Sequence, residues 1–147
     1  MAYVTADEIA SRLGPVAYVQ LTDDSGSGTP DLVVVEEARA AAEGEVDAYL
    51  ARRWAVPLEL SGLGGAAGLI RGWVLDVVEY RLHARRPPVP ADVIRKHDAA
   101  VSALQRLVSG GMALPTNVGV AANAAAAPVA EVTGPARMFS RESLERN

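Results

Sequence analysis

The chain has 147 residues, which is enough for one domain and too few for a second catalytic domain beside it. Its formal charge of −4 argues against the phosphate backbone of nucleic acid as the main ligand, because neutralising several phosphates needs a basic face. The absence of cysteine excludes disulfides, thiolate metal sites and cysteine nucleophiles.

Half of the residues are hydrophobic, but many of these are alanine, and the chain has only one Phe and two Trp. We therefore expect a thin core of Leu, Val and Ala, with Trp54, Trp73 and Tyr80 as its large side chains. No stretch reaches the roughly 20 apolar residues that a membrane span requires, and no signal peptide is recognisable. These observations predict a soluble protein that does not bind membranes.

The first predicted helix begins at a capping box, in which the Thr5 hydroxyl and the Glu8 carboxylate satisfy each other's backbone donors. Ile9 and Leu13 lie one turn apart, which indicates a short amphipathic helix. Gly14 and the proline after it are expected to end this helix. A polar loop over residues 22–30 follows.

A second helix is predicted from Asp31, a good N-cap, to about Arg53. Spacings of three and four put one set of apolar residues on a single face: Val35, Ala38, Ala42, Val46 and Tyr49. A set of charged residues lies opposite, where we expect solvent: Glu36, Glu37, Arg39, Glu43 and Asp47.

The glycine-rich run 61–65 separates this helix from a third, predicted over residues 66–84. The third helix has the broadest apolar stripe and is expected at the centre of the core: Leu69, Ile70, Trp73, Val74, Val77 and Tyr80. A proline-rich spacer over residues 86–90 precedes a fourth helix, predicted over residues 91–109. Four of its residues are expected to point inward: Ile94, Val101, Leu104 and Val108.

From Pro115 onward the composition changes to an alanine-rich, low-complexity run with proline and glycine on both sides. Such a stretch cannot bury enough apolar surface to offset its own ordering entropy. We therefore predict a helical body over residues 1–112 and an extended C-terminal arm over residues 113–147 that orders against a partner. The expected fold is mainly α: a small bundle of about four helices with this arm, and with room for short strands.

Two loops carry weak ligand-binding patterns. The loop from Asp23 to Asp31 has the outline of a calcium loop, but Val34 stands where a bidentate glutamate belongs, so a solvated turn capped by Asp31 is the favoured interpretation. The run 62–67 matches a loose dinucleotide-binding pattern, but no strand is predicted before it. A flexible loop between helices is therefore expected there.

No set of residues predicts an active site. His83 and His97 are the only histidines, and both are expected to be polar helix residues rather than bases or ligands. No serine nucleophile motif occurs. Asp76 and Glu79 can share one helix face, where salt links to nearby arginines or exposure to solvent explain them. We predict no catalytic, metal-binding or cofactor-binding residue and no enzyme activity; a metal-dependent enzyme is the weakest alternative.

Four side chains near the end of the third helix form a basic cluster: Arg81, His83, Arg85 and Arg86. Cations there complement the helix dipole, and Arg81 and Arg85 are the expected salt-link partners of Asp76 and Glu79. The cluster also allows two other functions. It could bind an acidic partner surface, or it could serve a small helical nucleic-acid-binding or regulatory module, which is the alternative function.

Six segments together resemble, in order and spacing, the Mu-like phage and prophage proteins that act as neck or head-completion adaptors. They are residues 3–9, 19–23, 46–54, 56–58, 76–82 and 138–144, which read YVTADEI, VQLTD, VDAYLARRW, VPL, DVVEYRL and MFSRESL. The chain departs from the family in two places. The aspartate loop is less acidic here, and the alanine-rich residues 118–130 align with nothing.

The resemblance implies a virion protein of the neck, assembled in the host cytoplasm as a ring, commonly of twelve copies, beneath the portal. Its partners would be other copies of itself, the portal protein, and a tail terminator or another neck protein, with DNA passing through the channel without sequence-specific binding. We expect Phe139 to be a buried anchor for a partner, and packing onto its own helices is the alternative. The full set of expected interface residues is Arg81, Arg85, Arg86, Arg137, Met138, Phe139, Arg141 and Leu144.

Overall fold

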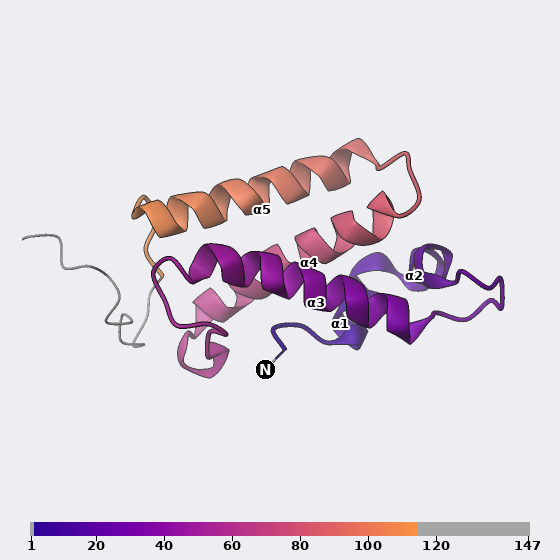
Figure 1. Ribbon diagram of the computed structural model, residues 1–147, viewed down its shortest axis with the longest axis horizontal. Coiled ribbons are helices and arrows are strands. Elements are labelled where there is room, and N and C mark those ends of the chain that lie inside the picture. The colour runs from indigo at the N-terminus through magenta and orange to yellow at the C-terminus, as the bar shows by residue number, and fades with distance from the viewer. Residues whose placement is uncertain (1, 115–147) are drawn as a thin grey trace, which may run out of the picture.

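The computed structural model describes residues 2–114, which form five α-helices, one 3-10 helix and no strand (Figure 1). The elements are α1 (Ala6–Leu13), α2 (Pro15–Thr22), α3 (Leu32–Leu50), η1 (Leu60–Gly62), α4 (Gly65–Ala84) and α5 (Ala91–Ser109). The expected mainly α bundle is confirmed, with one helix more than predicted. Except for Ala113 and Leu114, the predicted C-terminal arm lies outside the described residues.

Helix α4 is the centre of the bundle, as its broad apolar stripe predicts. It contacts α1, α2, α3, α5 and η1, and α3 and α5 contact each other as well. Ile70, Val74 and Val77 of α4 are fully buried, whereas Leu69 is half exposed and therefore does not belong to the core. Each helix in the described part is too short or too polar to cross a bilayer.

The N-terminal signals of α1 and α3 behave as predicted. The Thr5 hydroxyl accepts a hydrogen bond from the Glu8 amide at 3.2 Å, and Glu8 accepts one from the Thr5 amide at 2.7 Å. Asp31 caps α3 by accepting from the amide of Val33 at 2.8 Å. These contacts satisfy donors that a helix start leaves without intrahelical partners.

Helix α2 is missing from the sequence-based prediction, which treats Gly14 and Pro15 only as a stop signal. Gly14 has a φ of 78°, which turns the chain after α1, and Pro15 then occupies the first turn of α2. Proline is tolerated there because amide hydrogens in the first turn have no intrahelical acceptor, so the amide hydrogen that proline lacks is not needed. The same pair of residues therefore ends one helix and begins the next.

Part of the predicted solvent face of α3 is covered by the N-terminal segment, so the prediction is wrong at Glu43 and Asp47. Glu43 Oε1 accepts from the amide of Tyr3 at 2.8 Å and from that of Val4 at 3.3 Å. Asp47 accepts a hydrogen bond from the Tyr3 hydroxyl. Helix α3 also ends at Leu50, earlier than predicted.

Helix α5 has the predicted bounds, but its buried face is rotated from the predicted one. Ile94 is 41% exposed, and Val101 and Val108 are only partly buried. The buried residues are Val93, Ala100, Ala103, Leu104 and Leu107. Two alanines on this face, Ala100 and Ala103, allow α5 to approach its neighbours closely, and the prediction from bulky apolar residues leaves them out.

Candidate functional site

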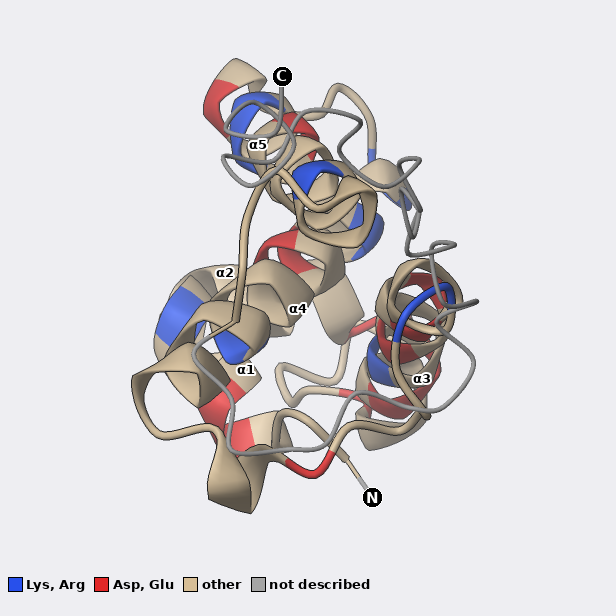
Figure 2. Ribbon diagram, turned by 90° about the vertical axis from the view of Figure 1, so that its left-hand side faces the viewer, with Lys and Arg blue, Asp and Glu red and all other residues tan. Residues whose placement is uncertain are grey.

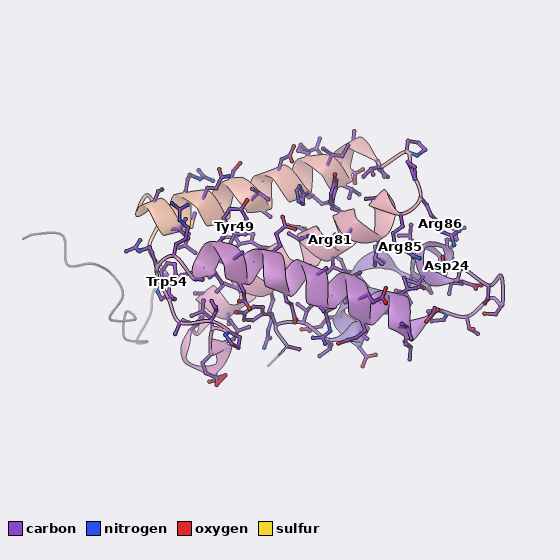
Figure 3. The ribbon with its side chains drawn as sticks, in the orientation of Figure 1. Asp24, Tyr49, Trp54, Arg81, Arg85 and Arg86 are labelled. Carbon is purple, nitrogen blue, oxygen red and sulfur yellow. The ribbon has the colours of Figure 1, made fainter. Side chains whose placement is uncertain are left out.

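The predicted basic cluster ties the end of α4 to other parts of the bundle. Arg81 pairs with Glu45 of α3 at 2.6 Å. Arg85 donates to the carbonyl oxygen of Leu21 at 2.9 Å and pairs with Asp24. Arg86 pairs with the same carboxylate at 3.1 Å, as Figure 3 indicates for these labelled side chains.

These contacts hold the loop after α2 against the end of α4. Hydrogen bonds from Arg85 first and from Arg86 second lower the pKa of Asp24 below its usual range. Arg85 and Arg86 remain partly exposed, with 34% and 47% of their side chains accessible. Their predicted contact with a partner stays a prediction, and any partner would meet arginines that already share a carboxylate.

A groove of about 470 Å³, lined by charged and aromatic side chains, lies where α3, α4 and α5 meet. Its lining includes Glu45, Tyr80, Arg81 and His97. The His97 ring stacks on Tyr80 with centroids 4.2 Å apart. Its Nε2 lies 3.8 Å from Glu45, so a protonated His97 would share this carboxylate with Arg81. The arrangement can hold helices together electrostatically, and no set of three potential metal ligands occurs within residues 2–114.

Asp76 and Glu79 share a face of α4 and form ion pairs, as the sequence suggests, but with other cations than Arg81 and Arg85. Arg12 of α1 pairs with both carboxylates, at 3.3 Å from Glu79. Lys96 of α5 lies 3.2 Å from Glu79 on the other side. Burial raises the pKa of Asp76, and Arg12 opposes that shift. This network connects three helices through one buried carboxylate.

The loop with the calcium-like pattern is an exposed turn organised by Asp23. Its carboxylate accepts from the amides of Ser25 and Ser27 at 3.1 Å and from that of Gly28 at 2.6 Å. These bonds, that from Gly28 foremost, lower the pKa of Asp23 to about 2. The carboxylate is thus occupied by amides of its own loop, in agreement with the predicted solvated turn.

The glycine-rich run 62–67 joins η1 to α4, as expected of a connection, but the prediction of a flexible loop across all of it is wrong, because residues 65–67 already belong to α4. It follows η1 rather than a strand, and α4 begins at Gly65. Leu63 within it is 2% exposed, so the loop is packed onto the core. Gly64 has a φ of 53°, a conformation that favours glycine. The glycines of this run therefore allow the tight turn from which α4 begins.

Tyr3 makes a structural contact that is not predicted from the sequence. Its side chain is buried, and its hydroxyl donates to Asp47 and accepts from the Leu58 amide at 2.7 Å. Burial and the Asp47 contact raise the pKa of Tyr3. No local sequence pattern predicts this contact, because Tyr3 precedes the first helix and its hydrogen-bond partners are 44 and 55 positions away.

A second groove, of about 500 Å³, lies at the start of α3 and is mostly apolar. We call it the α3 groove; its lining residues are Ala6, Leu32, Val33, Val35, Glu36 and Glu37. Leu32 is 63% exposed and Val33 is 66% exposed. This surface is not among the predicted sites, although an apolar pair directly after the N-cap Asp31 is a sequence signal that could have indicated it.

The predicted interface residues of the C-terminal arm lie outside the described residues: Arg137, Met138, Phe139, Arg141 and Leu144.

Within residues 2–114, the fold and its polar contacts define a small α-helical bundle protein in which many charged side chains join helices and loops to one another; Figure 2 marks the acidic and basic residues along these elements. A model of the bacteriophage Mu Gp36 family matches residues 3–132. The chain therefore belongs to this family and is a Mu-like phage protein. The resemblance drawn from the sequence is confirmed at this level. No curated protein matches the chain.

Proposed function

We propose that this protein is a structural protein of the phage particle, a head-tail connector in the neck. It assembles beneath the portal as a ring of twelve copies, the number that its resemblance to neck adaptors implies, and links the portal to the tail. The observation that carries the proposal is the exposed pair Leu32 and Val33 in the α3 groove, on a chain of the bacteriophage Mu Gp36 family. Exposed apolar surface of this kind favours contact with another protein.

A ring needs heterologous contacts, in which one surface of each copy meets a different surface of the next. The α3 groove is one candidate surface. Leu69 of α4, 50% exposed, and Ile94 of α5, 41% exposed, lie on other helices and supply apolar surface elsewhere. The ion pairs that join α1, α4 and α5 favour a body that enters the ring as a preformed unit.

We propose a structural rather than an enzymatic function, with DNA passing through the ring without sequence-specific binding. The alternative, a nucleic-acid-binding module, would use the basic cluster. Arg85 and Arg86 share Asp24 and Arg81 pairs with Glu45, which reduces the positive charge available to phosphates. These pairs support the connector over the alternative.

Electron microscopy of the purified full-length protein, alone and mixed with the portal, tests the proposal. Rings, or copies added around the portal, are the expected result. A protein that stays monomeric and does not bind the portal would contradict the proposal. An electrophoretic shift assay at low salt tests the alternative, which tight, salt-sensitive DNA binding would favour.

A matched pair of variants links the ring to the α3 groove. Val33→Asp places a charge in the groove, but an acidic residue in the first turn suits the helix dipole, so α3 should persist. Val56→Asp alters an exposed valine in the loop after α3. We expect Val33→Asp to abolish ring formation with unchanged helical circular dichroism, and Val56→Asp to retain rings.

A further inference from the structure

The α3 groove combines an apolar surface with an acidic edge. Leu32 and Val33 provide exposed apolar area. Glu36 pairs with Arg39 but keeps 59% of its side chain accessible. Glu37 lies beside it on the exposed surface and forms no ion pair within residues 2–114. A complementary ligand would therefore bring large apolar side chains flanked by positive charge.

The sequence beyond Leu114 contains a segment with this chemistry. Residues 137–141 read Arg-Met-Phe-Ser-Arg, so two large apolar side chains stand between two arginines. Phe139 is the one phenylalanine of the chain. Aromatic residues and arginine are enriched among residues that dominate binding at interfaces. Composition and charge thus match the segment to the groove.

Helix α5 ends at the far end of the bundle from the α3 groove (Figure 1). Arg53, just after α3, donates to the carbonyl oxygen of Leu107 in the last turn of α5, at 3.1 Å. The groove lies at the other end of α3, whose 19 residues span about 28 Å. Figure 3 shows the two ends, with Trp54 at one and Asp24 at the other.

Residues 115–136 connect the body to this segment and can span at most roughly 70 Å when extended. To reach the groove of its own copy, the chain would have to run back along the whole bundle. The extended connector is long enough to reach either its own groove or that of another copy. In the proposed ring, where one surface of each copy meets a different surface of the next, the groove of a neighbour is the shorter-range partner that avoids this path back along the bundle.

We propose that the α3 groove binds residues 137–141 of a neighbouring copy. The apolar pair of this segment packs on Leu32 and Val33, and its arginines lie beside Glu36 and Glu37. The inference rests on the proposed ring and deepens it by naming the contact that connects successive copies.

Disulfide trapping tests the contact, because the chain has no cysteine of its own. Full-length Val33→Cys with an affinity tag is mixed with untagged full-length Met138→Cys and oxidised mildly. We expect a tagged-to-untagged crosslink on non-reducing gels. The matched control replaces Val33→Cys by Val16→Cys, since Val16 is 67% exposed on α2, outside the groove. A crosslink no stronger than in this control overturns the proposal.

Charge reversal tests the acidic edge in the same assay. Glu37→Lys in the tagged chain should lower the crosslink yield several-fold, and Arg141→Glu in the untagged chain should restore it. Failure of the second change to restore the yield counts against the proposed pairing. Electron microscopy of the cysteine-free protein separates the two proposals. Rings without the crosslink overturn this contact alone, whereas the absence of both overturns the ring as well.

Discussion

The hydroxyl of Tyr3 donates a hydrogen bond to the carboxylate of Asp47, which joins the N-terminal segment to the last turns of α3. The same oxygen accepts from the amide of Leu58 at 2.7 Å, in the loop beyond α3. Tyr3 is 3% exposed, so water does not compete for these bonds. One side chain therefore holds three separate segments together.

Removing this hydroxyl should destabilise the fold. Tyr3→Phe keeps the aromatic side chain but leaves the Leu58 amide without its hydrogen-bond acceptor, which should lower the free energy of unfolding by about 1 to 3 kcal/mol. Urea denaturation followed by circular dichroism measures the change. Tyr49→Phe is the matched control, because no hydrogen bond of the Tyr49 hydroxyl occurs within residues 2–114. Equal effects of the two substitutions would contradict the importance of the Tyr3 contact.

Alkaline pH should destabilise the protein through the same residue. Burial and the Asp47 contact raise the pKa of Tyr3, so the folded state retains a proton that the unfolded state loses above about pH 10. The contribution of Tyr3 is therefore complete below about pH 10 and declines as the pH rises further. Urea midpoints measured from pH 9 upward should fall more steeply for the natural protein than for Tyr3→Phe. Parallel curves would refute this assignment.

Neutralising the buried carboxylate of α4 should weaken the connection between three helices. Glu79→Gln keeps the shape of the side chain but removes the charge that Arg12 and Lys96 share. We expect a loss of about 1 to 3 kcal/mol in the free energy of unfolding. Glu59→Gln, at an exposed position, should leave stability nearly unchanged. An unchanged denaturation midpoint in Glu79→Gln would show that the network contributes little.

Acid titration should identify Asp23 as an unusually acidic residue. Amide hydrogen bonds from its own loop lower its pKa to about 2, so its carboxyl carbon resonance should shift near that pH. Its contribution to stability is present above the unfolded pKa of about 4 and is lost as the pH falls through the folded value. Gly28→Ala, which strains a glycine with a φ of 77°, should raise the pKa of Asp23. A normal titration near pH 4 in the natural protein would exclude the described loop geometry.

Two substitutions on α5 distinguish the observed buried face from the one that the sequence predicts. Leu107→Ala removes a fully buried side chain and should cost about 2 to 4 kcal/mol in the free energy of unfolding. Ile94→Ala removes a side chain of a residue that is 41% exposed, and should cost less than about 1 kcal/mol. Urea denaturation of both variants makes the comparison. A larger loss of stability in Ile94→Ala than in Leu107→Ala would support the face predicted from the sequence instead.

Much of the helical body could be predicted from the sequence because its signals are local. Helix α1 begins at the pair Thr5 and Glu8, and α3 begins at Asp31, through contacts within one turn. Such contacts depend on few neighbours, so the residue pattern alone predicts them. The family resemblance likewise came from segments read in order.

The candidate sites could be predicted only in part, because their partners are distant in sequence. Arg85 and Arg86 were recognised as a basic cluster, but their pairing with Asp24 depends on a loop more than 60 positions earlier. The α3 groove requires Ala6 beside Leu32 and Val33, a juxtaposition that the packing of α1 near α3 creates. No periodic pattern of residues in the sequence predicts contacts between segments that lie so far apart.

The sequence by itself determined where four of the helices lie, that the bundle is mainly α, and that α4 is central, because capping and hydrophobic spacing act over a few residues. Only the tertiary structure decided which face of α5 is buried, which cations neutralise Glu79, and that Tyr3 lies on α3. These features depend on how closely helices approach one another. That distance is set by packing among side chains far apart along the chain.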